Sequence, residues 1–148
     1  MNNFFKYITL FSVTFSSSIY ADVIEDLILP EGFKISIYAE NIKSARQIAE
    51  SKDGNIFVGS KSGDSVMALI DSNNDNYAET KITVASGLSN PTGVALKNGD
   101  LYFSEIDKIW IIKNIDEYMQ SGAYEELPLK EIYTDQLPSD SWHGWKWL

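Results

Sequence analysis

Oxygen-bearing side chains recur in one polar segment of the sequence, residues 71–79. They occupy its first, third, fifth and ninth positions: Asp71, Asn73, Asp75 and Glu79. This spacing lets a tight loop point carboxylates and amides at one cation, and hard oxygen ligands suit calcium. The match is incomplete, because Asn76 stands where calcium loops usually have glycine, and the twelfth position is Ile82 instead of a bidentate Glu. The segment is therefore either a calcium site or an Asx-rich hairpin connection whose side chains bond their own backbone.

A second candidate for chemistry is His143, the only histidine of the chain, which lies among three tryptophans in residues 142–147. An imidazole with a pKa near ~6.5 can accept a substrate proton at neutral pH and return it. The surrounding rings can exclude water and stack on a sugar or a planar cofactor. A histidine in such a segment can equally be an inert, hydrogen-bonded filler of an apolar seam. The residue types alone leave both interpretations open.

The elements that must position these residues are indicated by a repeat, in which residues 51–60 find an echo in residues 96–105. Each copy reads as strand, turn, strand, with Asp53-Gly54 or Asn98-Gly99 at the turn. These dipeptides tolerate the positive φ of a tight hairpin. A period of about 40–50 residues with about four short strands is typical of β-propeller blades. The sequence predicts an all-β fold, a β-propeller with about two four-stranded blades and the start of a third.

Alternating apolar residues predict where these strands lie. The first blade takes 46–50, 55–59, 65–70 and 80–85, and the second takes 92–97, 100–104, 108–113 and 130–134. We also expect a half-buried strand at 33–39 and a short helical turn within 116–124. The only arginine, Arg46, enters an innermost strand, and such strands line the central channel of a propeller. Arg46 is therefore either a cofactor or substrate contact at the channel mouth or a solvated surface group.

Residues 1–21 have the features of a secretory signal peptide: Lys6, an apolar stretch at 7–15 and Ala21 at the cut. We expect residues 22–148 to be periplasmic or secreted, with no transmembrane segment, and to form the N-terminal part of a propeller that continues beyond Leu148. The chain has no cysteine, so the exported domain would use no disulfide. A net charge of −9 disfavours a nucleic-acid partner, because phosphate contacts need clustered Lys and Arg.

An ordered set of short motifs runs through residues 29–35, 45–46, 53–58, 69–71, 87–95, 101–102 and 143–146. Together they resemble the glucose/sorbosone dehydrogenase family, exported six-bladed propellers that use pyrroloquinoline quinone. The likeness covers residues 29–148, about the first third of a family member. Each motif alone is short, and the specificity comes from their order.

The resemblance implies oxidation of a sugar or aldehyde hydroxyl, with hydride transfer to pyrroloquinoline quinone and calcium as a further cofactor. His143 matches the histidine that acts as general base in the family, and Arg46 stands where the family places a polar residue facing the channel. A small mediator, quinone or cytochrome would accept the electrons. The family's later cofactor-binding residues do not occur within these 148 residues, so the chain by itself would be an incomplete, inactive piece.

Two other functions fit the same fold, because a propeller does not by itself determine an activity. One is a gluconolactonase-like enzyme that hydrolyses sugar lactones around a divalent cation, which would need carboxylates at the central axis. The other is a non-catalytic scaffold that binds a protein or glycan.

Overall fold

The computed structural model describes residues 24, 26–142 and 144–148. The chain divides into two compact units, residues 1–36 and 37–148. In the first unit, a turn forms where the amide of Phe33 donates to the carbonyl of Pro30 at 3.1 Å and Gly32 has a φ of 86°. The predicted signal peptide at 1–21 lies outside the described residues.

The strand predicted at residues 33–39 is wrong, because the structure assigns no strand to these residues. Phe33 and Ile35 remain 69% and 44% exposed. Alternation of apolar residues indicates two faces, but a strand also needs a neighbour for its backbone groups. At the end of this segment the carbonyl of Tyr38 does find a backbone partner, since it accepts the amide of Ala78 at 2.7 Å.

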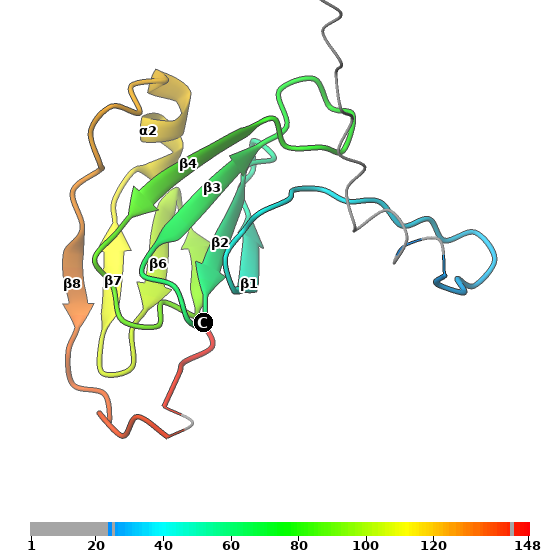
Figure 1. Ribbon diagram of the computed structural model, residues 1–148. Helices are drawn as coiled ribbons and strands as arrows, with labels where there is room; N and C mark the ends of the chain where they lie inside the picture. The colour runs from blue at the N-terminus through cyan, green and yellow to red at the C-terminus, as the bar shows by residue number, and fades with distance from the viewer. Residues whose placement is uncertain (1–23, 25, 143) are drawn as a thin grey trace, which may run out of the picture. The chain divides into compact units, whose positions relative to one another are not determined.

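The second unit contains two four-stranded antiparallel sheets, shown in Figure 1. The first sheet consists of β1 (Ala45–Glu50), β2 (Ile56–Ser60), β3 (Val66–Ile70) and β4 (Thr80–Ala85). The second sheet consists of β5 (Val94–Lys97), β6 (Asp100–Ser104), β7 (Ile109–Ile112) and β8 (Glu131–Thr134). In both sheets, strands that are consecutive in the chain are neighbours. The all-β prediction is confirmed, together with all eight strand positions of the two predicted blades, whereas ring closure stays a prediction.

The two repeated hairpins differ by one residue in their turns. In the first, the amide of Ser51 donates to the carbonyl of Asn55 at 2.9 Å, and Gly54 has a φ of 81°. In the second, Lys97 pairs with Asp100, and the two residues between them, Asn98 and Gly99, both have positive φ, as a type I′ turn requires. The Asp-Gly and Asn-Gly signals therefore predicted both turns correctly.

The main core lies between the two sheets. It contains Phe57 and Val66 from the first sheet and Leu101 and Phe103 from the second, all fully buried. The opposite face of the first sheet is also buried, because Val58 and its neighbours pack against residues 38, 39 and 42. The centre of the first sheet is thus covered on both faces, and alternate residues of β2 supply the two cores.

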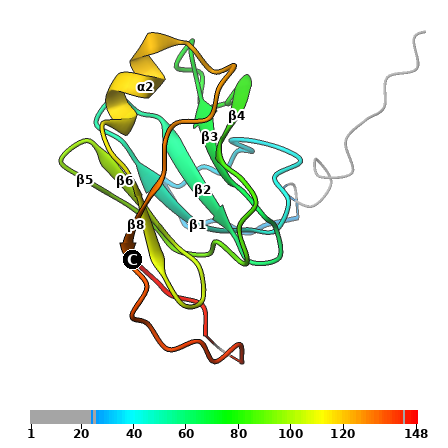
Figure 2. The same cartoon turned by 90° about the vertical axis from the view of Figure 1, so that its left-hand side faces the viewer.

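The helix α2 (Ile115–Ser121) connects β7 to β8 and confirms the predicted helical turn. It ends at Gly122, whose φ of 68° is the usual left-handed conformation at a helix C-terminus. Ile115 and Met119 join the main core. Figure 2 shows α2 at the end of the sheets where the β5–β6 turn lies. The helix therefore covers that end of the core and brings its polar side chains to the hairpin turns.

Candidate functional site

The beginning of β1 meets two other segments at Gln47. Its amide Nε2 donates to the carbonyl of Val94, at the start of β5, at 3.0 Å and to the carbonyl of Leu148 at 2.9 Å. The three segments held in this way are β1, β5 and residues 144–148. We call this meeting point, formed by Gln47, Val94 and Leu148, the Gln47 junction.

A close backbone contact recurs on either side of the Gln47 junction. A Cβ added to Gly59 would lie 2.5 Å from the carbonyl oxygen of Thr92, and one added to Gly93 would lie 2.5 Å from that of Lys146. Both positions need glycine, because no side chain fits at these distances. The backbone amide of Ser60 donates to the carbonyl of Pro91 at 2.7 Å, and the hydroxyl of Ser104 donates to that of Lys146 at 3.2 Å. The end of β2 thus contacts the segment that leads into β5, and the end of β6 contacts residues 144–148.

Cationic side chains lie against the tryptophans beside this junction. The guanidinium carbon of Arg46 is 5.5 Å from the centre of the Trp147 ring, and the ammonium of Lys61 is 4.6 Å from that of Trp145. Such distances give favourable cation–π contacts. Arg46 is exposed, as a ligand contact would need. His143, the predicted general base, lies outside the described residues.

Sequence reasoning missed Gln47, the most constrained polar residue of this region. Its Oε1 is buried, and within the described part of the chain it has no hydrogen-bond partner. A buried acceptor without a donor is costly, so this atom fits a donor supplied by water or by a ligand. Its position directly after Arg46 in a predicted inner strand was a signal that we did not use. An arginine, a tryptophan face and a buried acceptor together fit a planar anionic cofactor.

The acidic loop, residues 71–79, connects β3 to β4. The side chain of Asp71 accepts the amides of Asp75 and Asn76, at 3.2 and 2.8 Å, and the side chain of Asp75 accepts the amide of Tyr77 at 2.9 Å. Asn73 accepts the Asp75 amide at 2.9 Å and donates to its carboxylate at 3.1 Å. The bonds of the predicted Asx-rich hairpin connection are therefore present.

The same loop keeps a donor set that suits calcium. Asp71, Asp75 and Glu79 each offer one carboxylate oxygen, and these oxygens lie within 4.8 Å of one another. Asn76 has a φ of 70°, so it adopts the conformation for which calcium loops use glycine. Hydrogen bonds from the backbone amide of Ser72 and from its hydroxyl lower the pKa of Glu79 and favour its charged form. Calcium binding stays a prediction for this loop.

The acidic loop and the Gln47 junction lie at opposite ends of the first sheet. The loop leaves β3 after Ile70, and Leu69 pairs with Ile56, which pairs in turn with Glu50 at the end of β1. Gln47 lies near the beginning of β1. The structure therefore brings the four loop residues together and places Arg46 against Trp147. These two groups lie apart, at opposite ends of the first sheet.

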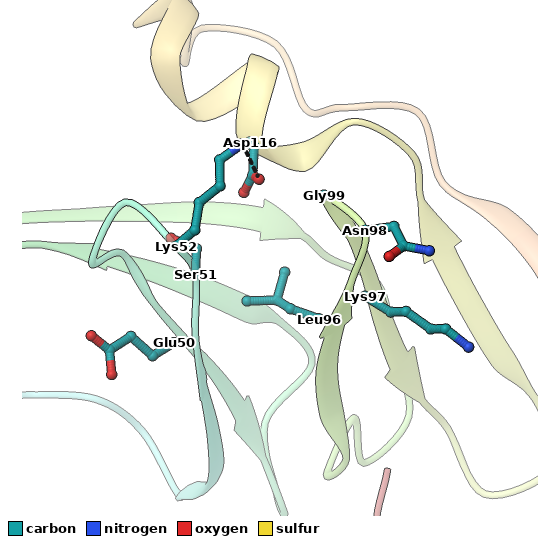
Figure 3. Close-up of a pocket in the computed structure, with 8 residues that line it drawn as sticks. All are labelled: Glu50, Ser51, Lys52, Leu96, Lys97, Asn98, Gly99 and Asp116. Atoms are coloured by element: carbon teal, nitrogen blue, oxygen red, sulfur yellow. Dashed lines mark ion pairs between the residues drawn. The ribbon is translucent and has the colours of Figure 1, made fainter.

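A hollow of about 440 Å³ lies where the β1–β2 and β5–β6 turns approach each other (Figure 3). We call it the turn hollow. Its lining residues are Glu50, Ser51, Lys52, Leu96, Lys97, Asn98, Gly99 and Asp116. The ammonium of Lys52 and the carboxylate of Asp116 form an ion pair at 3.2 Å. The hydrogen bond and charge of Asp116 raise the pKa of Lys52, and Asp53 adds to the effect.

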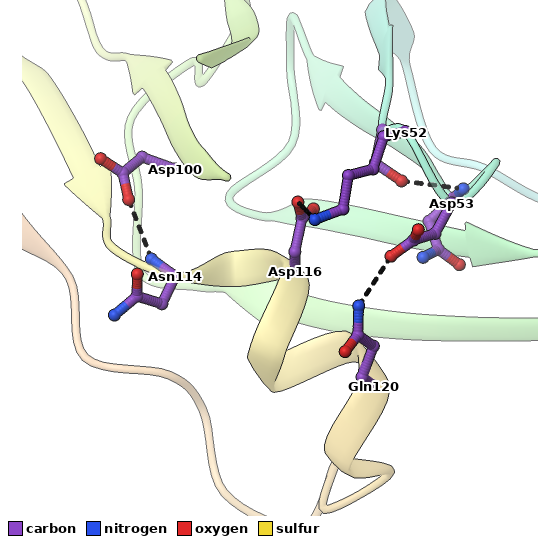
Figure 4. Close-up of polar contacts among 8 residues, drawn as sticks. Lys52, Asp53, Asp100, Asn114, Asp116 and Gln120 are labelled. Carbon is purple, nitrogen blue, oxygen red and sulfur yellow. Dashed lines mark hydrogen bonds and ion pairs between the residues drawn. The ribbon is translucent and has the colours of Figure 1, made fainter. Parts of the chain in front are cut away.

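The contact between α2 and the first hairpin turn is polar and has two parts, visible in Figure 4. One is the Lys52–Asp116 ion pair, and the other is a hydrogen bond of 2.9 Å from the Gln120 amide to the Asp53 carboxylate. In addition, the backbone amide of Asn114 donates to Asp100 at 2.9 Å just before the helix. These pairs could not be predicted from the sequence, because their partners lie far apart in the chain.

No helix among the described residues has the length and the apolar character needed to cross a lipid bilayer.

No family model matches the chain. The chain is similar to an uncharacterized protein of Borreliella burgdorferi, with 34% identity over 119 residues, which make up 79% of this chain and 30% of that protein. The chain thus spans less than a third of the length of this relative.

Proposed function

We propose that the two sheets are adjoining blades of a β-propeller of the glucose/sorbosone dehydrogenase type. The Gln47 junction is the observation that carries this proposal. One side chain there binds both β5 and residues 144–148. In addition, Ser60 at the end of β2 bonds the carbonyl of Pro91, and Ser104 at the end of β6 bonds that of Lys146. A contact that recurs from one sheet to the next is what a radial arrangement of blades requires.

On this proposal the protein oxidises a sugar or aldehyde hydroxyl with pyrroloquinoline quinone. Arg46 and Trp147 would hold the planar anion, since a guanidinium pairs with carboxylates and an indole stacks on rings. The buried Oε1 of Gln47 would accept a hydrogen bond from the bound cofactor or substrate. The quinone supplies the acceptor for the hydride, and a small mediator or cytochrome would take the electrons afterwards.

His143 is proposed as the general base. Its imidazole takes the proton of the substrate hydroxyl and can return it to solvent once the product has left. The assignment rests on the resemblance of residues 143–146 to the family motif. Trp145 and Trp147 follow His143 in the sequence and contact Lys61 and Arg46, respectively. These contacts hold residues 145–147 beside Arg46.

Calcium at the acidic loop would stabilise the first sheet and take no part in the reaction, because the loop lies at the other end of that sheet from the Gln47 junction. A lactonase would need carboxylates around a central divalent cation. The contacts at the junction are instead made by an amide, a guanidinium and backbone carbonyls. This difference favours the dehydrogenase over the hydrolase.

The proposal is tested with the protein produced from its complete reading frame and reconstituted with pyrroloquinoline quinone and calcium. We expect reduction of a redox dye that depends on both the quinone and an aldose. His143→Ala should lower the turnover number about 10²- to 10⁴-fold, the usual share of a general base, while quinone binding persists. Glu131→Gln, an exposed change on β8, serves as the matched control.

Quinone binding is followed separately through the quenching of tryptophan fluorescence. Arg46→Ala should weaken this binding about tenfold or more, because it removes a charged partner of the anion. Absence of both quinone binding and dye reduction in the unmodified protein would refute the dehydrogenase. Metal-dependent hydrolysis of a sugar lactone without any quinone would instead establish the alternative.

A further inference from the structure

We propose that the turn hollow binds a primary alkylammonium group, with the Asp116 carboxylate as acceptor of the ammonium and Leu96 as the surface for the apolar stem. This inference is independent of the proposed redox function. It concerns the end of β1 and β5 that lies away from the Gln47 junction.

The first support is the combination of a cavity with a largely buried carboxylate. The hollow has a volume of about 440 Å³, enough for a small organic ion. The Asp116 side chain is only 10% exposed. A carboxylate withdrawn from water in this way needs a cationic partner or strong donors, since an unpaired buried charge is costly.

The second support is that an ammonium group, that of Lys52, already contacts the Asp116 carboxylate. The Nζ of Lys52 lies 3.2 Å from Oδ2 of Asp116, so the structure already places an ammonium at this position. Lys52 itself is 68% exposed and reaches the carboxylate from the first hairpin turn. An exposed lysine in an ion pair contributes little and loses side-chain entropy in it, so a ligand can displace it readily. Lys52 is therefore the internal competitor of the ligand.

The charges nearby favour a cation over an anion. Asp116, Asp53 and Glu117 all raise the pKa of Lys52, which shows that the potential at its ammonium is negative. Asp53 is already engaged by Gln120 at 2.9 Å, which leaves Asp116 to receive the ligand. A divalent metal ion fits less well, because calcium takes about six to eight oxygen ligands and Asp116 offers a single carboxylate.

The shape of the hollow selects an alkyl stem. In Figure 3 the side chain of Leu96 points into the space between the two turns, while Glu50 and Lys97 extend away from it in opposite directions. Contact with Leu96 removes apolar surface of both partners from water. A ligand with a cationic head and a short aliphatic stem can contact both the Asp116 carboxylate and the Leu96 side chain, whereas a simple ammonium ion can contact only the carboxylate.

The experiment is a titration of the protein, produced from its complete reading frame, with n-butylammonium while the amide resonances of Asn98 and Gly99 are followed. We expect saturable shifts. Asp116→Asn should weaken binding about tenfold or more, because it removes a charge-assisted bond. Lys52→Met should strengthen binding about threefold to tenfold, because it removes the competing ammonium and keeps an apolar stem. Glu131→Gln, which also removes one negative charge but at a residue that does not line the hollow, should leave the affinity unchanged.

Chemical controls separate the two parts of the ligand and its sources. n-Butanol has the alkyl stem but no charge, and ammonium chloride has the charge but no stem. Neither compound should produce saturable shifts at the same resonances. A blocked peptide with a single internal lysine tests whether the ammonium can come from a protein. Tighter binding of the peptide than of n-butylammonium would identify a lysine side chain as the source, and the reverse would identify a free amine.

Two outcomes would overturn the inference. One is equal affinity of n-butylammonium for the unmodified protein and for a folded Asp116→Asn variant. The other is weaker binding to Lys52→Met, which would show that Lys52 helps the ligand instead of competing with it. Because Lys52 is exposed, we expect the Lys52→Met variant to fold. The inference can therefore be refuted with this variant even if Asp116→Asn fails to fold.

Discussion

The first and second sheets have the same strand order but differ in how their faces are covered. The central strands β2 and β3 of the first sheet are buried on both sides, by the main core and by the smaller cluster around Val58, although Ile48 on the edge strand β1 is 66% exposed. In the second sheet, Phe103 belongs to the main core, whereas Ile132 and Tyr133 on β8 are 52% and 61% exposed. A strand pattern therefore specifies a sheet, but its contribution to stability depends on what covers each face.

The largest expected effect tests the covered side of this comparison. Phe57→Ala empties the centre of the main core, where Phe57 is completely buried, and should lower the free energy of unfolding by about 3–5 kcal/mol. Urea unfolding followed by circular dichroism measures the loss. The matched control is Phe33→Ala, which alters a side chain that is 69% exposed and should stay within about 0.5 kcal/mol. Equal losses for the two variants would show that the sheets do not share this core.

A second change tests the contact between the first sheet and β5. Gly59→Ala places a Cβ 2.5 Å from the carbonyl oxygen of Thr92 and 2.7 Å from that of Pro91, and both are backbone atoms. Relief requires a shift of the two segments, so we expect a loss of about 1–3 kcal/mol in the free energy of unfolding. Thermal melting checks it. An unchanged melting temperature would mean that β5 is not held against β2 as described.

A third, smaller effect tests the exposed side. Tyr133 contacts Tyr102 edge to face, with ring centres 5.2 Å apart, and this is its one ring contact among the described residues. Tyr133→Ala should therefore cost about 0.5–1.5 kcal/mol in urea unfolding. A loss as large as that of Phe57→Ala would show that a further segment covers this face in the complete protein.

The smallest effect concerns the acidic loop of the first sheet and depends on pH. The pKa of Glu79 is lowered from 4.5 in the folded protein, so the unfolded chain binds its proton first as the pH falls. The stabilisation from Glu79 is complete above about pH 4.5 and is lost as the pH falls through the lowered value. Melting temperatures of the unmodified protein and of Glu79→Gln should thus differ near neutral pH and converge in acid. A constant difference across this range would contradict the linkage.

The local part of the fold could be predicted from the sequence. Asp53-Gly54 and Asn98-Gly99 located both repeated turns, because the positive φ of Gly54, Asn98 and Gly99 is a local requirement of the chain. The strands followed from alternation, which is also local. The segment at 33–39 shows the limit of this reasoning, since Phe33 and Ile35 alternate correctly but have no neighbouring strand to pair with.

The candidate sites were predicted only in part. The acidic loop was found because Asp71, Asn73, Asp75 and Glu79 are close in sequence, so their spacing is visible before folding. Gln47 and the Lys52–Asp116 pair were missed, because each depends on partners brought in from another sheet or from the helix. Neither residue type nor spacing identifies such pairs in a single sequence.

The hydrogen bond from Gln47 to Leu148 also orders events during synthesis. It joins residues that are 101 positions apart, whereas the hairpin turns close over two or three residues. As the chain leaves the ribosome, each sheet can therefore form as its own strands emerge, and the Gln47 junction must wait for Leu148. Until then the carbonyl of Val94 is the only one of its two acceptors available to the Gln47 amide, so the junction is completed in two steps that are separated in time.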